Sequence, residues 1–363
     1  MVQAPRRPTI SDVADAAGVS KTAVSFAFNR PDRLASETAT RIRTVADSLG
    51  YRPHPVARML SQGRTHTIGV LTPQALSLIF ENPFFGTFAS GIAAAAEAAG
   101  YVLQFVSPFH GSLIRAIDRA TIDGVVAIGL SANHPEVEQI RQAGVPMVLV
   151  DSTAFPKQAG VDVDDEGGAR LAAEHLVALG HRNVAVLAIE SSDAEGAEEP
   201  DGVPARRLRG YRAGLAAAGI ELADESVVTA PATVLGGAAA LAETWESGLR
   251  PTGILAMSDA MAIGAMHAAR ELGLDVPADV SVVGFDDVEL AQFSDPALTT
   301  IHQPIAHKGE QAVELLLGIL EGTAGPEQHE ILPTRLVVRA STGPARGVVR
   351  SPAEGGASEQ SQV

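Results

Sequence analysis

Residues 8–30 read PTISDVADAAGVSKTAVSFAFNR and have the pattern of two short helices joined by a tight turn. Apolar side chains recur between Ile10 and Ala17 at the spacing of one helix face, and Thr9 or Ser11 can cap the start of that helix. A helix, a break and a second helix therefore fit within about twenty residues.

A glycine and a serine mark the turn between these two helices. Gly18 takes the positive φ that follows a helix C-terminus at no steric cost, and Ser20 can accept from the free N–H groups that open the next helix. The second helix has one apolar face and one face with a cation, two hydroxyls, an amide and a ring. The residues of this outward face are Lys21, Thr22, Ser25, Phe26 and Asn29.

The outward face has the chemistry that reads base edges in the DNA major groove. Lys21 can donate to guanine O6 and N7, and Phe26 can meet a thymine methyl group. A solvated face in a three-helix bundle fits the same pattern, so this face alone leaves both interpretations open. A third helix is expected from Ser36, as its N-cap, to Gly50, and it should close a small core.

The run T-I-x-D-V-A-x-x-A-G-V-S-x-x-A-V-S-x-x-x-N at residues 9–29 resembles the N-terminal signature of the LacI/GalR (lactose-repressor) family of bacterial transcription regulators. The resemblance implies that Lys21 and Thr22 occupy the two principal base-reading positions, with Phe26 one turn later. Many relatives carry arginine at the third position, so a guanine contact there is not expected. The other DNA contacts expected in the head are Ser20, Ser25 and Asn29.

Residues 53–64 form the joint between the head and the rest of the chain. Two prolines precede a segment of only five to seven helical residues, and Gly63 follows it, so a helix here cannot be stable alone. In the family, the corresponding V-A-R-x-L segment is a hinge helix that orders on operator, pairs with its dimer mate and inserts a leucine into the minor groove. The resemblance thus makes Ala57 and Leu60 DNA contacts. An ordinary flexible linker is the alternative.

Composition limits the class of protein. The 363 residues are 46% hydrophobic with a mean hydropathy of +0.14, and no run of eighteen apolar residues occurs, which favours a soluble globular chain. The first residues lack the apolar region of a secretory signal. The chain has no cysteine, which excludes disulfides, thiolate metal sites and cysteine nucleophiles. We expect a cytoplasmic protein that needs no metal or other cofactor.

Charge is distributed unequally along the chain. Residues 1–64 contain ten Lys and Arg against five Asp and Glu, a net charge of +5. The remaining residues contain 17 against 38, a net charge of −21, and the whole chain therefore has −16. A basic head on an acidic body is expected when only the head faces phosphates.

From Thr67 onward, short apolar runs alternate with helical stretches, and several of these helices end in glycine just before the next run. This repeat is typical of βα units on parallel sheets, and so many strands divide better between two lobes than within one sheet. The expected strands are 68–71, 102–106, 124–128, 147–151, 184–188, 227–229, 253–257 and 281–285.

The family resemblance extends over residues 8–341 and is reinforced by SVVGFDD at 281–287 and LTTIHQP at 298–304. It implies an all-α helix-turn-helix head at 8–52 and, at 65–343, a periplasmic-binding-protein-like α/β core of two lobes with parallel sheets. We expect the lobes to be joined by three crossings near residues 160, 291 and 323. Lobe 1 would then be about 65–161 and 292–323, and lobe 2 about 162–291 and 324–343. Residues 1–7 and the polar tail at 344–363 are expected to be disordered.

Ligands of open α/β sheets bind outside the carboxyl ends of the strands, where this chain places several polar residues. Carboxylates accept from paired hydroxyls and arginine supplies a rigid donor fork, a combination that suits a sugar or similar polyol. The resemblance implies effector contacts there, although a turn former, helix cap, surface ion pair or core aromatic is the structural alternative for each. Ser258 lies where many sugar-binding relatives carry asparagine, so a lactose-like ligand is not assumed. The expected effector-binding residues are Phe84, Phe85, Asp151, Arg207, Ser258 and Asp286.

These features predict a homodimeric transcription regulator, a repressor, that binds a pseudo-palindromic double-stranded operator and responds to a small molecule. A regulator triggered by a partner protein or a nucleoside-type corepressor is an alternative. A solute-binding protein is disfavoured by the missing signal and by the head. An enzyme is not expected, because phosphate-loop, zinc-protease, nucleophile-elbow and dinucleotide motifs are all missing from the sequence.

Overall fold

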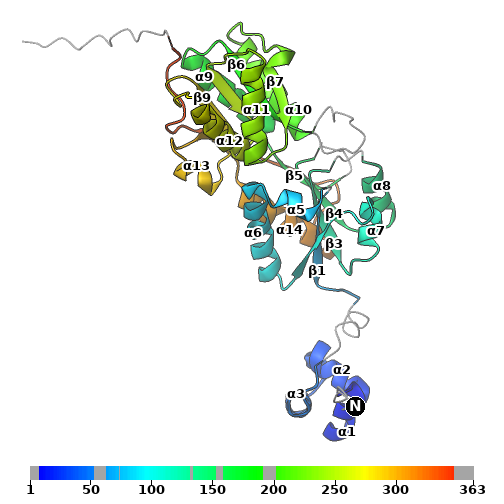
Figure 1. Ribbon diagram of the computed structural model, residues 1–363. Helices are drawn as coiled ribbons and strands as arrows, with labels where there is room; N and C mark the ends of the chain where they lie inside the picture. Colours follow the sequence, from blue (N-terminus) through cyan, green and yellow to red (C-terminus); the bar gives the residue numbers. More distant parts are fainter. Residues whose placement is uncertain are drawn as a thin grey trace, which may run out of the picture. The chain divides into compact units, whose positions relative to one another are not determined.

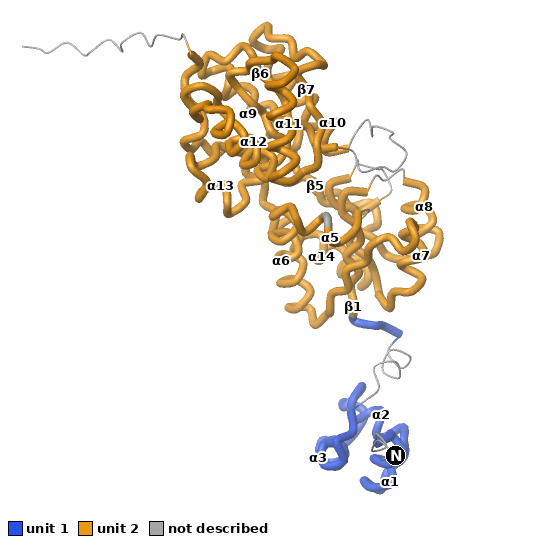
Figure 2. The backbone as a smooth tube through the Cα atoms, in the orientation of Figure 1, with its two compact units in different colours: residues 1–66 blue, residues 67–363 orange. Residues whose placement is uncertain are grey.

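The computed structural model describes residues 8–52, 63–72, 74–130, 134–152, 158–190 and 202–346 (Figure 1). The chain divides into two compact units, residues 1–66 and 67–363 (Figure 2). The predictions for residues 1–7, for the tail from residue 347 and for the hinge contacts Ala57 and Leu60 lie outside the described residues. Within the described ranges, no helix is long and apolar enough to cross a bilayer.

The first unit is a small helical head. Thr9 and Asp12 form a reciprocal capping box at the first helix, Gly18 ends that helix at φ 65°, and the Ser20 hydroxyl accepts from the N–H of Ala23. Its core consists chiefly of Val13, Val24 and Ile42. The elements of the head are α1 Ile10–Ala17, α2 Lys21–Asn29, η1 Pro31–Arg33 and α3 Ser36–Leu49.

The predicted cap of the third helix is wrong by one residue. Ser36 is the first residue of α3, and the N-cap is Ala35, whose extended backbone (φ −60°, ψ 138°) precedes the first helical turn. Ala35 has no side chain that can cap, so this helix begins without a side-chain hydrogen bond. The Ser36 carbonyl instead accepts from the Thr40 hydroxyl at 2.9 Å.

The second unit contains two lobes, each built on a six-stranded sheet. In the first lobe α6 and α14 pack on one face of the sheet and α7 and α8 on the other (Figure 1). The strands, in spatial order, are β11 His329–Leu332, β5 Gly160–Val163, β4 Met147–Val150, β3 Gly124–Ile128, β1 Thr67–Leu71 and β2 Val102–Val106. The helices are α5 Leu76–Ile79, α6 Pro83–Ala98, α7 Leu113–Ile117, α8 Pro135–Gln142 and α14 Ile305–Glu321.

The second lobe repeats this layered arrangement, with α9 and α10 on one face and α11 and α12 on the other. All strand pairs in both sheets are parallel except β12, which is antiparallel to β10. The strands, in order, are β12 Arg335–Val337, β10 Thr299–His302, β9 Ser281–Asp286, β8 Gly253–Ala256, β6 Val184–Ile189 and β7 Val227–Ala230. The helical elements are α9 Asp165–Ala178, α10 Val203–Ala216, η2 Asp224–Ser226, α11 Val234–Glu246, α12 Asp259–Glu271 and α13 Glu289–Phe293.

The crossing predicted near residue 160 lies close to the observed one, but the crossings predicted near 291 and 323 are misplaced, because the sequence pattern did not predict four of the strands. β5 lies in the first sheet, so the first crossing follows residue 163. β10 pairs with β9, which assigns residues 292–302 to the second lobe and moves the next crossing to 303–304. β11 pairs with β5, so residues 324–332 belong to the first lobe and the last crossing lies at 333–334.

The tail predicted from residue 344 also begins too early. The N–H of Ala345 donates to the carbonyl of Leu179 at 2.9 Å, and Arg346 forms an ion pair with Asp279. Ala345 is buried. Residues 344–346 therefore belong to the packed surface of the second lobe.

Candidate functional site

The predicted reading face of the head lies at the start of α2. Lys21 and Thr22 are exposed in the first turn, whereas Ser25, Phe26 and Asn29 are half-buried. All five lie on the helix that Ser20 caps, and the Ser20 hydroxyl oxygen accepts from the Ala23 N–H at 3.1 Å. Ser20 therefore sets the backbone of the first turn and keeps its own O–H available to donate.

Two internal contacts order the second turn of this face. The Asn29 side-chain amide donates to the Ser25 hydroxyl at 3.3 Å. The guanidinium of Arg33 lies 5.7 Å from the centre of the Phe26 ring, within the range of a cation–π contact. Phe26, with the Arg33 guanidinium against its ring, therefore occupies the position at which a longer cationic side chain is common in the family.

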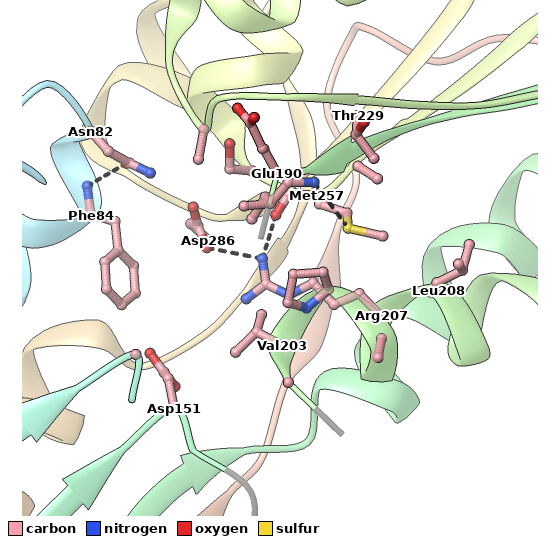
Figure 3. A pocket seen from close by; sticks show the side chains of 18 of the residues that line it. Asn82, Phe84, Asp151, Glu190, Val203, Arg207, Leu208, Thr229, Met257 and Asp286 are labelled. Carbon is pink, nitrogen blue, oxygen red and sulfur yellow. Dashed lines mark hydrogen bonds and ion pairs between the residues drawn. The ribbon is translucent and has the colours of Figure 1, made fainter. Parts of the chain in front are cut away.

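The core contains a cavity of about 640 Å³ between its lobes. All six residues predicted to bind an effector line it, as Figure 3 shows for Phe84, Asp151, Arg207 and Asp286. Phe84, Phe85 and Asp151 come from the first lobe, and the other three come from the second. Asp151, Ser258 and Asp286 follow or end parallel strands, as predicted, whereas Phe84 and Phe85 lie on α6 and Arg207 on α10.

On the side of the first lobe, Asp151 is held by the buried Lys308, which was not among the predicted site residues. Lys308 Nζ donates to both carboxylate oxygens of Asp151 at 2.7 Å and to Gln303 Oε1 at 2.8 Å. Burial raises the pKa of Asp151, and the Lys308 ammonium opposes that rise. Lys308 has no exposed side-chain surface and lies over the Phe84 ring at 4.8 Å. It therefore orients both the acid and the aromatic wall.

On the side of the second lobe, Asp286 and Arg207 face each other. Arg207 Nη1 lies 3.7 Å from Asp286 Oδ1 and also donates to the Met257 carbonyl, while its guanidinium stacks over Phe285 at 3.6 Å. Gln303 Nε2 donates to Asp286 at 2.6 Å. Burial raises the pKa of Asp286 to about 6, although Arg207 and the Gln303 hydrogen bond act against it.

The backbone at Asp286 is strained. Its φ of 123° lies in a region that L residues rarely adopt, and strain of this kind is found chiefly at functional sites. Asp151 also has a positive φ of 55°. Both acids are thus held at strand ends in backbone conformations that turn their carboxylates toward the cavity. Asp151 meets Lys308 there, and Asp286 meets Arg207.

Ser258 and Phe84 complete the walls of the cavity. Ser258 caps α12, and its Oγ accepts from the Met261 N–H at 3.2 Å, so its hydroxyl proton remains to be donated. Phe84 packs edge to face with Phe85, with ring centres 5.3 Å apart. Asn82 caps α6 through its Oδ1, which accepts from the Phe84 N–H.

Asp165, the buried acid behind Arg207, is a further residue of the site that no sequence pattern predicted. Its Oδ1 accepts from Arg207 Nε at 2.8 Å and its Oδ2 from Arg206. Burial acts to raise the pKa of Asp165, but the charges of Arg207 and Arg206 outweigh this effect and hold the pKa below its ordinary value.

One signal could have revealed Lys308: it lies three residues after Ile305 and four before Ala312, within the apolar stripe of α14.

Within the described residues, no group of three or more His, Asp or Glu side chains is arranged to hold a metal ion. The polar groups of the site are carboxylates, guanidinium groups and a hydroxyl, and they lie beside an aromatic wall. These groups match the hydroxyls and apolar faces of a neutral polar ligand.

Comparisons with known proteins fit this geometry. Residues 9–54 match the family described as bacterial regulatory proteins, lacI family, and residues 173–342 match a periplasmic binding protein-like domain. The ribose operon repressor of Escherichia coli (strain K12) is 33% identical over 335 residues, which are 90% of this chain and 97% of that repressor. The chain belongs to the LacI family. It is a DNA-binding transcriptional regulator, as its sequence signature implied.

Two solved structures of LacI-family proteins resemble the chain along almost its whole length. A Lac repressor dimer bound to operator and the anti-inducer ONPF matches with a TM-score of 0.79 and 28% identity, covering 93% of this chain and 100% of that one. A complex of the regulator CelR with cellobiose matches with a TM-score of 0.68 and 29% identity, covering 92% and 100%. These matches confirm the helix-turn-helix head and the two-lobed α/β core with parallel sheets.

Proposed function

We propose that this LacI-family member is a homodimeric repressor whose affinity for a pseudo-palindromic operator is controlled by a sugar or related polyol bound between its lobes. The observation that carries this proposal is the convergence of Asp286, Arg207 and Ser258 with Phe84 in one cavity. The carboxylate accepts from hydroxyls, the guanidinium and serine donate, and the ring packs on the apolar face of a pyranose or furanose.

The donor and acceptor capacity of these groups supports a neutral polyol. Both oxygens of Asp151 already accept from Lys308, whereas Asp286 has lone pairs beyond its bond from Gln303. Arg207 keeps Nη2 for a ligand, because its hydrogen bonds within the described part of the chain use Nε and Nη1. The cellobiose complex of CelR supports the choice of a sugar. The chemical identity of that sugar rests on binding experiments.

Control of DNA binding requires that the ligand prefer one arrangement of the lobes, since equal affinity for both shifts nothing. The cavity walls come from both lobes, so a change in lobe angle changes the separation of Phe84 from Asp286. An inducer would favour the arrangement with low operator affinity, and a corepressor the arrangement with high affinity. We expect no catalytic turnover of the bound ligand.

In the head, we assign base reading to Lys21, Thr22 and Phe26 and further contacts to Ser20, Ser25 and Asn29. Ala57 and Leu60 are assigned to the hinge. The exposed cation and hydroxyl in the first turn of α2 support this assignment, because groups there reach base edges when a helix enters the groove by its N-terminus. The operator-bound dimer among the matching structures supports the homodimer.

Calorimetric titration of the full chain against monosaccharides, disaccharides and nucleosides tests the ligand. We expect saturable heat with a sugar, and weaker but still measurable binding of that sugar by Arg207→Lys and Asp286→Asn. Arg170→Met, which removes an exposed ion pair on α9, serves as the control and should bind normally. Selective DNA binding without heat from any compound would instead support control by a partner protein.

Selection of bound fragments from random duplex DNA tests the other half of the proposal. We expect enrichment of a pseudo-palindrome, and a change in its retention when the sugar found by calorimetry is added. Enrichment of a single half-site would contradict the dimeric arrangement.

A further inference from the structure

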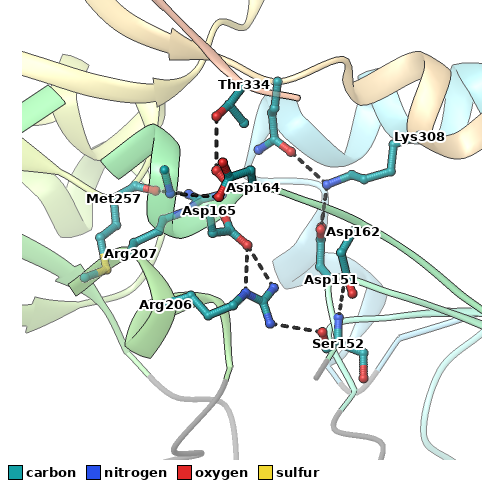
Figure 4. Close-up of polar contacts among 12 residues, drawn as sticks. Asp151, Ser152, Asp162, Asp164, Asp165, Arg206, Arg207, Met257, Lys308 and Thr334 are labelled. Atoms are coloured by element: carbon teal, nitrogen blue, oxygen red, sulfur yellow. Dashed lines mark hydrogen bonds and ion pairs between the residues drawn. The ribbon is translucent and has the colours of Figure 1, made fainter. Parts of the chain in front are cut away.

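Two adjacent arginines on α10 point in different directions from one shared acid. Arg207 lines the cavity, whereas Arg206 donates to the Ser152 carbonyl of the first lobe (Figure 4). Arg207 Nε donates to Asp165 Oδ1 at 2.8 Å, and Arg206 donates to Asp165 Oδ2 through Nε at 3.1 Å and Nη2 at 2.8 Å. A single buried carboxylate thus lies between the cavity and a second guanidinium.

Arg206 also makes a direct side-chain contact with the other lobe. Its Nη1 donates at 3.0 Å to the backbone carbonyl of Ser152, which follows β4 in the first lobe. Arg206 and Asp165 both belong to the second lobe, on α10 and α9. The Arg206 guanidinium therefore bridges the lobes beside the first covalent crossing, which lies between Val163 and Asp165.

The receiving carbonyl is itself held in place. The N–H of Ser152 donates to Asp162 Oδ1 at 2.9 Å, and Asp162 Oδ2 is 2.7 Å from His329 Nε2 on β11. The preceding residue, Asp151, is fixed by Lys308. Arg206 thus contacts a segment of the first lobe that is anchored from both sides.

The shape of a guanidinium makes this arrangement directional. Its donors lie in one plane, so the contact of Nε and Nη2 with Asp165 fixes the direction in which Nη1 points. If a ligand draws Arg207 away from Asp165 Oδ1, the carboxylate can turn, and the Arg206 fork turns with it. The bond to Ser152 then depends on what Arg207 contacts.

We propose that Arg206 is a positioning residue that transmits occupancy of the cavity to the contact between the lobes, through the carboxylate it shares with Arg207. The inference rests on the proposed function for its ligand. The hydrogen bonds that join Arg207, Asp165, Arg206 and Ser152 are present without any ligand or DNA. A parallel path from Lys308 through Gln303 to Asp286 runs along the second covalent crossing, whereas the Arg206 path lies beside the first crossing.

Distance measurement by pulsed electron paramagnetic resonance tests the link in the full chain. The protein has no cysteine, so Gln139→Cys on α8 and Ala216→Cys on α10, both exposed, place one spin label on each lobe. Labelled subunits are mixed with an excess of unlabelled chain, so that each dimer contains at most one labelled pair.

Arg206→Met should broaden the inter-lobe distance distribution and shift it to longer distances. Arg206→Lys keeps the charge but replaces the planar guanidinium with a single ammonium group. Its distance distribution should lie between those of Arg206→Met and of the unmodified residue. Arg170→Met removes an ion pair within α9 and should leave the distribution unchanged. A distribution in Arg206→Met as narrow as that of the unmodified residue would overturn the proposal.

Transmission from the cavity is tested by a double-mutant cycle that needs no ligand. Arg207→Met should change the distribution when Arg206 is present and should have no further effect in Arg206→Met. Equal, additive effects in both backgrounds would overturn transmission through Arg206. Thermal unfolding identifies variants that fail to fold, and Arg207→Lys then replaces Arg207→Met in the cycle. These measurements use neither sugar nor operator, so they can be interpreted even if the proposed function is wrong.

Discussion

Asp286 combines a raised pKa with a place in the cavity wall, and this gives the regulator a pH dependence. Its folded pKa of about 6 exceeds the ordinary value of 3.8, so its neutral form stabilises the fold at low pH, and that contribution is lost as pH rises through 6. A hydroxyl that donates to Asp286 favours the ionised form. Ligand affinity should therefore fall below pH 6, by up to about tenfold per pH unit.

Calorimetry at pH 5, 6 and 7 in buffers of different ionisation enthalpy measures this effect, because the ligand should release a proton on binding below pH 6. Asp286→Asn should remove the pH dependence. If the dependence persists in that variant, it belongs to another group, of which Asp259 is the first candidate, since burial and the Asp286 charge raise its pKa too.

The exposed first turn of α2 gives a second residue-scale prediction. Lys21→Ala and Thr22→Ala should each weaken operator binding by roughly 1–3 kcal/mol and relax base preference at one position. Binding to a library of single-base operator variants measures both effects. Thr44→Ala, an exposed threonine on α3, is the control. Loss of affinity without a change in base preference would move these residues from base reading to phosphate contact.

At the scale of elements, the close packing of α10 on α9 sets the arginines against Asp165. A Cβ on Gly210 would lie 2.2 Å from the Glu166 carbonyl oxygen and 2.7 Å from Ala169 Cβ, so the helices can approach this closely only without a side chain there. Gly210→Ala should force them apart and cost about 1–3 kcal/mol of unfolding free energy, despite the better helix propensity of alanine.

Thermal or denaturant unfolding measures this cost, with Gly86→Ala on α6 as the matched control. A Cβ at Gly86 meets nothing within 4 Å, so that change should be neutral or stabilise by up to about 1 kcal/mol. Gly210→Ala should also weaken ligand binding, because it displaces Arg207 from Asp165. A variant as stable as the Gly86 control would contradict the close approach.

At the scale of the whole molecule, the unequal charge of head and core predicts how DNA binding responds to salt. Residues 1–64 have a net charge of +5 and the rest of the chain −21, so attraction to phosphates must come from these N-terminal residues. A protein with six or more phosphate contacts loses roughly a thousandfold in affinity between about 50 and 200 mM salt. We expect a loss of this order for random duplex and a remaining preference for selected operator.

Fluorescence anisotropy over a salt series measures both quantities, and a chain lacking residues 1–66 should show no duplex binding at any salt concentration. Equal affinity for random and selected duplex at moderate salt would contradict sequence-specific regulation.

The sequence by itself determined the features that depend on neighbouring residues. Helix periodicity, the Thr9 and Ser20 caps and Gly18 predicted the head, while alternating apolar runs and glycine stops predicted the βα units. Asp151, Ser258 and Asp286 follow or end apolar runs that predict parallel strands, which is enough to place all three at the carboxyl ends of the sheets. Local hydrogen bonds and short apolar runs depend only on residues that are close together in the sequence.

Only the tertiary structure decided which distant groups meet. Lys308 is 157 residues from Asp151, and Arg206 is 54 residues from Ser152, so no local pattern relates them. The short strands β10, which is mostly buried, and β11, which lies at the edge of the first sheet, show no clear alternation, and their partners alone fixed the crossings. A buried ion pair needs a partner charge and hydrogen bonds that offset the cost of desolvation, and a paired strand needs a neighbouring strand to pack against. Both come from segments far apart in the chain, which is why residue order alone did not reveal them.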